Sequence, residues 1–226
     1  MVKTLGHPCG SSRYTKLLRK STTAPWPTTN DGLTHQNGGM TLTTDLCPSS
    51  KTGFERRLYQ TLIDRFKHPV PVTLFISGRW IAHHEEALKQ LHRWEQEGKL
   101  AITWGNHTYT HPYHPSKPLK HNFVLSPGYN LKSDTLKLEQ TLLERGIVPS
   151  IFFRFPGLVS DQKSMETIRG LGLIPIGSDA WLAKGQQPKQ GSIILIHGNK
   201  NEPKGVDLFL KMVESNRLRK LHPLQP

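Results

Sequence analysis

The chain of 226 residues contains few cysteines, few acidic side chains and no long hydrophobic run. With only Cys9 and Cys47, it is not a disulfide-rich scaffold, and it lacks the paired cysteine spacing of structural zinc sites. One disulfide between Cys9 and Cys47 is possible, but nothing in the sequence requires it. No apolar run approaches the roughly 20 residues that span a bilayer, so we expect no transmembrane segment. No apolar stretch follows the first basic residues, so no signal peptide is visible.

Acidic residues are outnumbered, because 30 Lys and Arg face 17 Asp and Glu and leave a net charge of +13. Much of this excess lies near the ends, with five basic side chains and one acid before residue 41 and three further bases after Glu214. This distribution favours general attraction to an anionic surface. No nucleic-acid-binding motif accompanies it, so we predict no specific nucleic-acid partner and interpret both ends as solvated tails.

Three regions follow from composition and periodicity. Residues 1–38 are rich in Ser, Thr, Pro, Gly and Asn and show no period, which predicts a flexible basic leader. Residues 39–216 alternate short apolar runs with helical stripes and form the expected catalytic domain, and residues 217–226 form a basic tail. Helical stripes cover 54–66 and 83–98, and Ser133 and Ser160 are predicted N-caps of two later helices.

Strands that alternate with helices predict an α/β fold with a parallel sheet. No glycine-rich phosphate-binding fingerprint follows the first strand, so a dinucleotide-binding doubly wound sheet is disfavoured. We therefore predict a distorted (β/α) barrel with about seven parallel strands. Six strands are visible in the sequence, and the proline-punctuated loop over 112–132 has room for a seventh.

Ionisable residues follow five of the apolar runs at the same end. In β/α barrels the loops at the carboxyl ends of the strands converge over the active site. Each residue alone has an ordinary explanation, as a turn residue, a helix cap, a surface charge or a core histidine. Five coincidences of position favour one shared site, formed by Asp45, His107, Arg154, Asp179 and His197.

The chemistry of this set is coherent. His107 and His111 are four residues apart, a spacing that lets two imidazoles face one metal ion. A nearby carboxylate can take a proton from water on a metal, whose pKa falls to roughly 7 on zinc. An arginine can hold that carboxylate by a bidentate contact, and a histidine across the site can protonate a leaving nitrogen. The set predicts metal-assisted hydrolysis of an amide or ester.

Five short motifs resemble those of the polysaccharide deacetylase family, the NodB-homology or carbohydrate esterase family 4 domain. TLTTDLCPS is similar to T-F-D-D-G-P, and NHTYTHP resembles the H-[ST]-x-x-[SD]-H metal motif in a shorter H-x-x-x-H form. RFPG resembles R-x-P-Y, SDAW resembles the D-x-x-D-W region, and LIH resembles the closing L-x-H. They occur in family order over residues 41–213. The resemblance implies a distorted seven-stranded β/α barrel.

The resemblance also implies catalytic roles. Asp45 would be the general base that activates water, and His197 would be the general acid. Arg154 would orient Asp45, and Asp179 would in turn buffer Arg154. The substrate implied is an N- or O-acetylated polysaccharide in the cell envelope or outside the cell, with a cytoplasmic location left open by the missing signal peptide.

For metal and substrate binding, the resemblance implies His107 and His111 as ligands of a divalent ion, with zinc expected first and cobalt or nickel as alternatives. The backbone N–H of Gly157 would donate to the oxyanion, a type of contact worth about 3 kcal/mol in other hydrolases. Trp181 would pack on the sugar.

The chain departs from the family at Leu46, where the family has its second aspartate and third metal ligand. Asp45 or water is the first replacement we expect, His114 the second and Cys47 the last, although Cys47 and Asp45 point the same way in an extended chain. A weak or absent metal site stays open. The alternatives to a deacetylase are therefore a metal-free hydrolase of a small C–N amide and an inactive glycan-binding relative.

Overall fold

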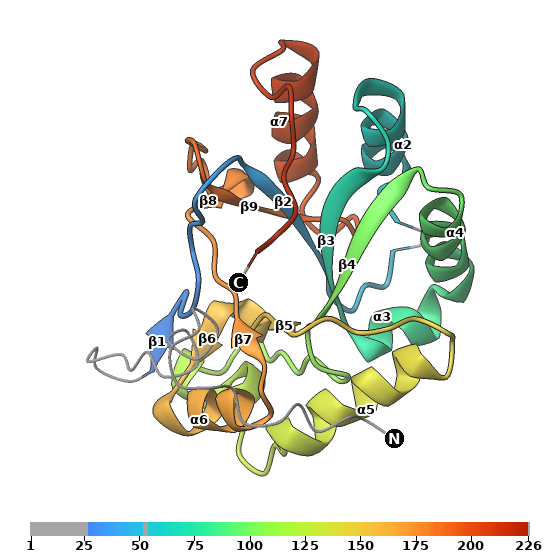
Figure 1. Ribbon diagram of the computed structural model, residues 1–226. Helices are drawn as coiled ribbons and strands as arrows, with labels where there is room; N and C mark the ends of the chain where they lie inside the picture. The colour runs from blue at the N-terminus through green and yellow to red at the C-terminus, as the bar shows by residue number, and fades with distance from the viewer. Residues whose placement is uncertain (1–26, 52–53, 226) are drawn as a thin grey trace, which may run out of the picture.

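The computed structural model describes residues 27–51 and 54–225, so Cys9 and most of the predicted leader lie outside the described residues (Figure 1). Seven parallel strands form one curled sheet in the order β7-β5-β4-β3-β2-β9-β8. Among the described strands, β7 and β8 are edges that do not pair with each other, so the curl is a half-barrel. The predicted fold class is confirmed. The strands are β2 (Thr41–Leu46), β3 (Val70–Ile76), β4 (Leu100–Asn106), β5 (Phe152–Phe153), β7 (Ile174–Pro175), β8 (Ala180–Trp181) and β9 (Ile193–His197).

Helices surround the outer face of this sheet (Figure 1). They are α2 (Arg56–Arg65), α3 (Gly78–His83), α4 (Glu85–Gln96), α5 (Leu131–Leu143), α6 (Gln162–Gly170) and α7 (Pro203–Glu214). The loop predicted to hold a seventh strand contains instead two short 3-10 turns, η1 (Leu119–His121) and η2 (Phe123–Leu125). The seventh strand is β8. No helix in the described part of the chain is long and apolar enough to cross a membrane.

Two predicted helix caps are displaced by one to three residues. The side chain of Asn130 accepts a hydrogen bond from the backbone N–H of Ser133, so Asn130 caps α5. Asp161 caps α6 by the same contact with Ser164, which returns a hydrogen bond and completes a capping box. Asn and Asp cap helices as well as Ser does, so the sequence left several candidates at each start.

The two faces of β2 separate apolar from polar side chains. Leu42 and Leu46 are fully buried in the main hydrophobic core, which lies between the sheet and the helices. Thr43 and Asp45 alternate with them and face the inside of the curl, where both contact Arg154. The inner face of the sheet thus carries polar groups toward its carboxyl edge.

Both ends of the described chain pack onto the fold. In the predicted leader, β1 (Thr28–Thr29) pairs with β6 (Val159–Ser160), and Leu33 forms a bridge with Ile176. In the predicted basic tail, the side chains of three leucines are buried: Leu218, Leu221 and Leu224. Residues 27–38 and 217–225 therefore belong to the folded domain rather than to solvated tails. The composition of these segments did not predict this packing, because basic and small polar residues surround the few apolar side chains that are buried.

Candidate active site

A pocket of about 630 Å³ opens at the carboxyl edge of the sheet. It brings together six of the eight predicted site residues: Asp45, His107, His111, Gly157, Trp181 and His197. Asp45 and His197 are direct neighbours in the register of β2 and β9. Parallel strands end at the same edge, so residues far apart in the sequence meet there.

Arg154 lies beneath the pocket and holds Asp45 in place. Its Nη1 donates to Asp45 Oδ1 at 2.7 Å, so the contact is through one nitrogen and not the bidentate fork expected. The guanidinium is fully buried, and burial lowers the pKa of Arg154 even against the attraction of Asp45. Asp45 Oδ2 remains directed into the site, 3.8 Å from His107 Nε2.

Asp179 does not contact Arg154, and this predicted relationship is wrong. Nε and Nη2 of Arg154 donate instead to the carbonyl oxygens of Ile176 and Gly177, at 3.2 and 2.9 Å. Asp179 pairs with His35 at 2.8 Å and accepts from the backbone N–H of Ile193 at 3.0 Å. It precedes β8 and lies at the amino end of β9, the end opposite His197. The run LIPIGSD is not one strand, because β7 already ends at Pro175.

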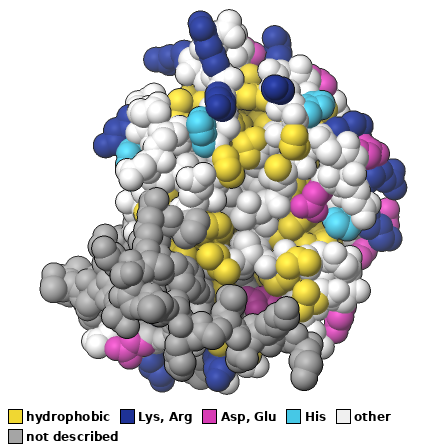
Figure 2. Space-filling view, viewed as in Figure 1, with side chains coloured by type: hydrophobic (Ala, Val, Ile, Leu, Met, Phe, Trp, Pro, Cys, Tyr) yellow, Lys and Arg dark blue, Asp and Glu magenta, His cyan; other side chains and the backbone are white. Residues whose placement is uncertain are grey.

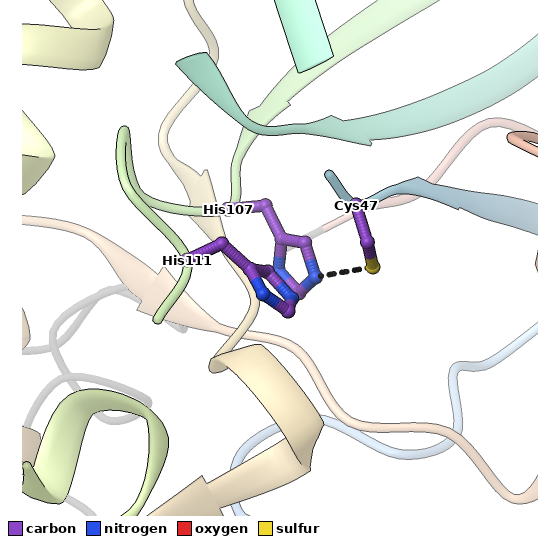
Figure 3. A group of neighbouring side chains, drawn as sticks. All are labelled: Cys47, His107 and His111. Atoms are coloured by element: carbon purple, nitrogen blue, oxygen red, sulfur yellow. Dashed lines mark hydrogen bonds between the residues drawn. The ribbon is translucent and has the colours of Figure 1, made fainter. Parts of the chain in front are cut away.

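Cys47, His107 and His111 form a buried cluster, and Figure 3 shows the thiol and both imidazoles turned toward one another. Their possible ligand atoms all lie within 4.8 Å of one another. Cys47 Sγ is 3.5 Å from His107 Nε2, and the two imidazole centroids are 4.7 Å apart. Nitrogen and sulfur donors in this number suit zinc and similar borderline ions, so the donor set fits the metal that the motifs imply.

The geometry favours an order of third donors that differs from the expected one. His114 is exposed, and its backbone N–H donates to Asn122. Asp45 is engaged by Arg154. Cys47, which we expected last, is the residue that completes the group with the two histidines. Cysteine at the end of an apolar strand usually serves packing, so sequence reasoning ranked it too low.

The charges of the cluster shift several pKa values. Burial alone would raise the pKa of the Cys47 thiol, but its interactions with the side chains of His111, His107 and His197 outweigh burial and lower that pKa well below its ordinary value. Burial would lower the pKa of His197, but the Cys47 thiolate and the Glu202 carboxylate raise it well above the ordinary histidine value. The site thus favours an anionic sulfur and a protonated His197.

Glu202 is a site residue that sequence reasoning missed. Its Oε2 accepts from His197 Nδ1 at 2.9 Å and from Trp181 Nε1 at 2.8 Å. Burial would raise the pKa of Glu202, but these two hydrogen bonds outweigh it and lower that pKa. The only signal in the sequence was an acid five residues after His197, just before the proline that opens α7.

Gly157 and Phe123 form part of the opposite wall. Gly157 has a left-handed φ of 63°, and a Cβ there would come within 2.5 Å of the Phe123 ring. Only glycine fits this backbone at that distance from the ring. Gly157 therefore lets the chain line the pocket closely, and the donation of its N–H to an oxyanion stays a prediction.

The family model described as polysaccharide deacetylase matches residues 33–176. The chain belongs to the polysaccharide deacetylase family. Its fold is similar to that of a family 4 carbohydrate esterase from Bacillus anthracis, at 19% identity and a TM-score of 0.62 over 95% of this chain and 89% of that one. It is also similar to the chitin deacetylase of Colletotrichum lindemuthianum, at 17% identity and a TM-score of 0.58 over 85% and 87% of the two chains.

A family 4 carbohydrate esterase pseudoenzyme from Bacillus anthracis also shares the fold, at 15% identity and a TM-score of 0.54 over 83% of this chain and 64% of that one. Within this member of the polysaccharide deacetylase family, Leu46 does not stand in the pocket. It is fully buried in the core under the helices. The chain therefore lacks the second aspartate of the family motif, but the leucine that replaces it does not contact the histidines of the pocket.

Proposed function

We propose that this polysaccharide deacetylase family member is a hydrolase that removes acetyl groups from an N- or O-acetylated polysaccharide with the help of a divalent metal, most suitably zinc. The observation that carries the proposal is the convergence of Asp45, the Cys47–His107–His111 cluster and His197 on one pocket. The family and the fold support the reaction class.

The protein groups divide the work by position. Asp45, held through Oδ1 by Arg154, presents Oδ2 toward the cluster and accepts a proton from the attacking water. His197, held by Glu202, donates a proton to the departing amine or alkoxide. An ion held by His107, His111 and a third donor would supply the positive charge that favours deprotonation of water and the oxyanion.

Substrate binding is assigned to the two walls of the pocket. The backbone of Gly157 lines one wall, where its N–H would donate to the oxyanion. The indole of Trp181 lies on the other wall, 5.9 Å from the His197 ring between centroids, and would pack on a sugar. Aromatic rings bind the apolar faces of ligands in this way.

We further propose an envelope or extracellular glycan as the substrate, with an anionic surface as an additional partner. Figure 2 shows Lys and Arg side chains gathered at the end of the molecule over α7 and α2. The exposed Arg217, Arg219 and Lys220 follow α7. Such a charged end would concentrate the protein near an acidic polymer or membrane surface.

Acetate release from N-acetylglucosamine oligomers and from O-acetylated glycans tests the function. We expect release that a chelator abolishes and that zinc, cobalt or nickel restores. His197→Ala should remove turnover, whereas His121→Ala, an exposed histidine outside the pocket, should not. Turnover of a small amide that resists the chelator would instead support a metal-free amidohydrolase. Glycan binding without any turnover would support an inactive relative.

A further inference from the structure

We infer that the thiolate of Cys47 is the third protein ligand of the metal, in place of the carboxylate that the second aspartate of the family motif supplies. The inference rests on the proposed metal-assisted function and names the donor set of that site as two imidazole nitrogens and one sulfur. It follows from three features of the described residues: the alternation of β2, the unsatisfied histidine nitrogen and the fixed backbone on both sides.

The alternation of β2 brings Cys47 and not Leu46 to the histidines. Side chains along an extended strand point to opposite faces in turn, so Asp45 and Cys47 share one face and Leu46 takes the other. Leu46 has no exposed surface and packs in the helix-side core. Cys47 lines the pocket with its sulfur 3.5 Å from His107 Nε2.

Both histidines offer a nitrogen to the same point. His107 Nδ1 donates to the carbonyl oxygen of Arg154 at 2.8 Å, so its Nε2 carries the lone pair that faces Cys47 Sγ. His111 is nine-tenths buried, and its Nε2 has no hydrogen-bond partner among the described residues. A buried polar atom without a partner destabilises the fold, and a coordinated cation would offset this cost.

The backbone holds the donors in place before any metal arrives. The carbonyl oxygen of Cys47 accepts from the side chain of the buried Asn199 at 2.9 Å. On the other side, the left-handed φ of 42° at His111 turns its ring back toward His107. The hydroxyl of Thr108 accepts from the N–H of His111 and secures this turn. Preorganised ligands lose little freedom on binding an ion, which favours affinity.

This donor set has chemical consequences that a carboxylate ligand would not. Thiolate is a softer donor, so the site should prefer zinc and cobalt over magnesium, calcium and manganese. Thiolate and carboxylate carry the same single charge, so the net charge of a site with two neutral imidazoles is unchanged. Asp45 also remains paired with Arg154 and available as the base.

Cobalt titration of the full-length metal-free chain tests the inference. Thiolate bound to Co²⁺ produces an intense near-ultraviolet charge-transfer band, and we expect this band to saturate at one cobalt per chain. Cys47→Ser should lose the band and weaken cobalt binding by at least about 100-fold, since loss of a residue that merely supports a ligand already costs 10- to 100-fold. Cys9→Ser, which changes the only other cysteine, is the matched control and should keep the charge-transfer band and the cobalt affinity.

A second variant separates ligation from folding. Cys47→Asp should bind cobalt without the charge-transfer band, because a carboxylate replaces the thiolate at the same position. Cobalt bound by the wild-type chain without the band would overturn the assignment. Unchanged cobalt affinity in Cys47→Ser would also overturn it, and together with lost turnover would indicate a nucleophilic cysteine instead.

The inference and the proposed function fail in different ways. Acetate release by a cobalt-loaded enzyme that shows no thiolate band would leave the function standing and remove Cys47 from the ligand set. A saturable thiolate band in a protein that deacetylates no glycan would confirm the ligand and reject the function.

Discussion

His197 Nδ1 lies 2.9 Å from Glu202 Oε2, and the indole N–H of Trp181 donates to the same oxygen. The family motif led us to expect Asp179 among the catalytic residues, but Asp179 lies at the amino end of β9, away from the pocket. Glu202 is therefore the carboxylate that orients the predicted general acid. We propose that it acts through His197 as a positioning residue.

Glu202→Gln should lower kcat by about tenfold and leave KM nearly unchanged, because the shape is retained while the negative charge beside His197 is lost. The raised pKa of His197 keeps it protonated, and activity should fall as the pH rises through that pKa. Removing the Glu202 charge lowers the pKa of His197, so the alkaline limb of the pH profile should move to lower pH.

The exposed Glu144→Gln is the control for this change and should leave kcat and its pH profile unaltered. Kinetics on an acetylated oligosaccharide across the neutral and alkaline range provide the measurement. An alkaline limb that stays in place in Glu202→Gln would show that Glu202 has no influence on the acid.

Asp45 and Arg154 should be energetically coupled, because both are buried and each compensates the other. Asp45→Asn and Arg154→Met should each lower the free energy of unfolding by about 3 kcal/mol, since each leaves one buried charge without its partner. The double variant should lose much less than the sum, while none of the three retains turnover.

Urea unfolding of the four proteins measures this coupling. Glu86→Gln, which breaks the exposed pair with Lys89, should leave the free energy of unfolding nearly unchanged. Strict additivity of the two active-site substitutions would refute the coupling.

Leu46→Asp restores the second aspartate of the family motif in the sequence but should not restore a metal ligand. Leu46 is fully buried in an apolar cluster, so a carboxylate there has no partner and faces away from the histidines. We expect a loss of stability at least as large as that of Leu46→Ala, about 3 kcal/mol, with no gain in zinc affinity. Tighter zinc binding, measured by calorimetry, would contradict the side-chain directions of β2.

Leu221 anchors the end of the described chain and is 4% exposed. Leu221→Ala should lower the free energy of unfolding by about 2–3 kcal/mol, because it leaves a cavity in the packed core. Leu143→Ala, at a half-exposed leucine, should change it by about 0.5 kcal/mol or less. Denaturant titration compares the two, and equal effects would mean that the end of the chain is not part of the cooperative fold.

Much of the architecture was readable in the sequence. Apolar runs alternating with helical stripes are enough to predict a parallel sheet with helices over it, because each pattern can bury its apolar side in only one way. The carboxyl ends of parallel strands meet, so Asp45, His107 and His197 could be assigned to one site from the order of the runs alone. Asp45 is the penultimate residue of β2, His107 directly follows β4 and His197 ends β9, where strand geometry determines the position of each side chain.

The proposed third metal donor, the partner of His197 and the position of Asp179 are visible only in the tertiary structure. His114 and Glu202 lie outside regular strands, where local periodicity no longer determines which way a side chain points. Cys47 directly follows β2 and shares the face of Asp45, but the alternation of β2 does not show that His107 and His111 lie beside that face. Packing of the loops over the carboxyl edge places Cys47 and Glu202 in the pocket and leaves His114 in solvent. These contacts depend on how separate loops pack against one another, so no spacing within the sequence could encode them.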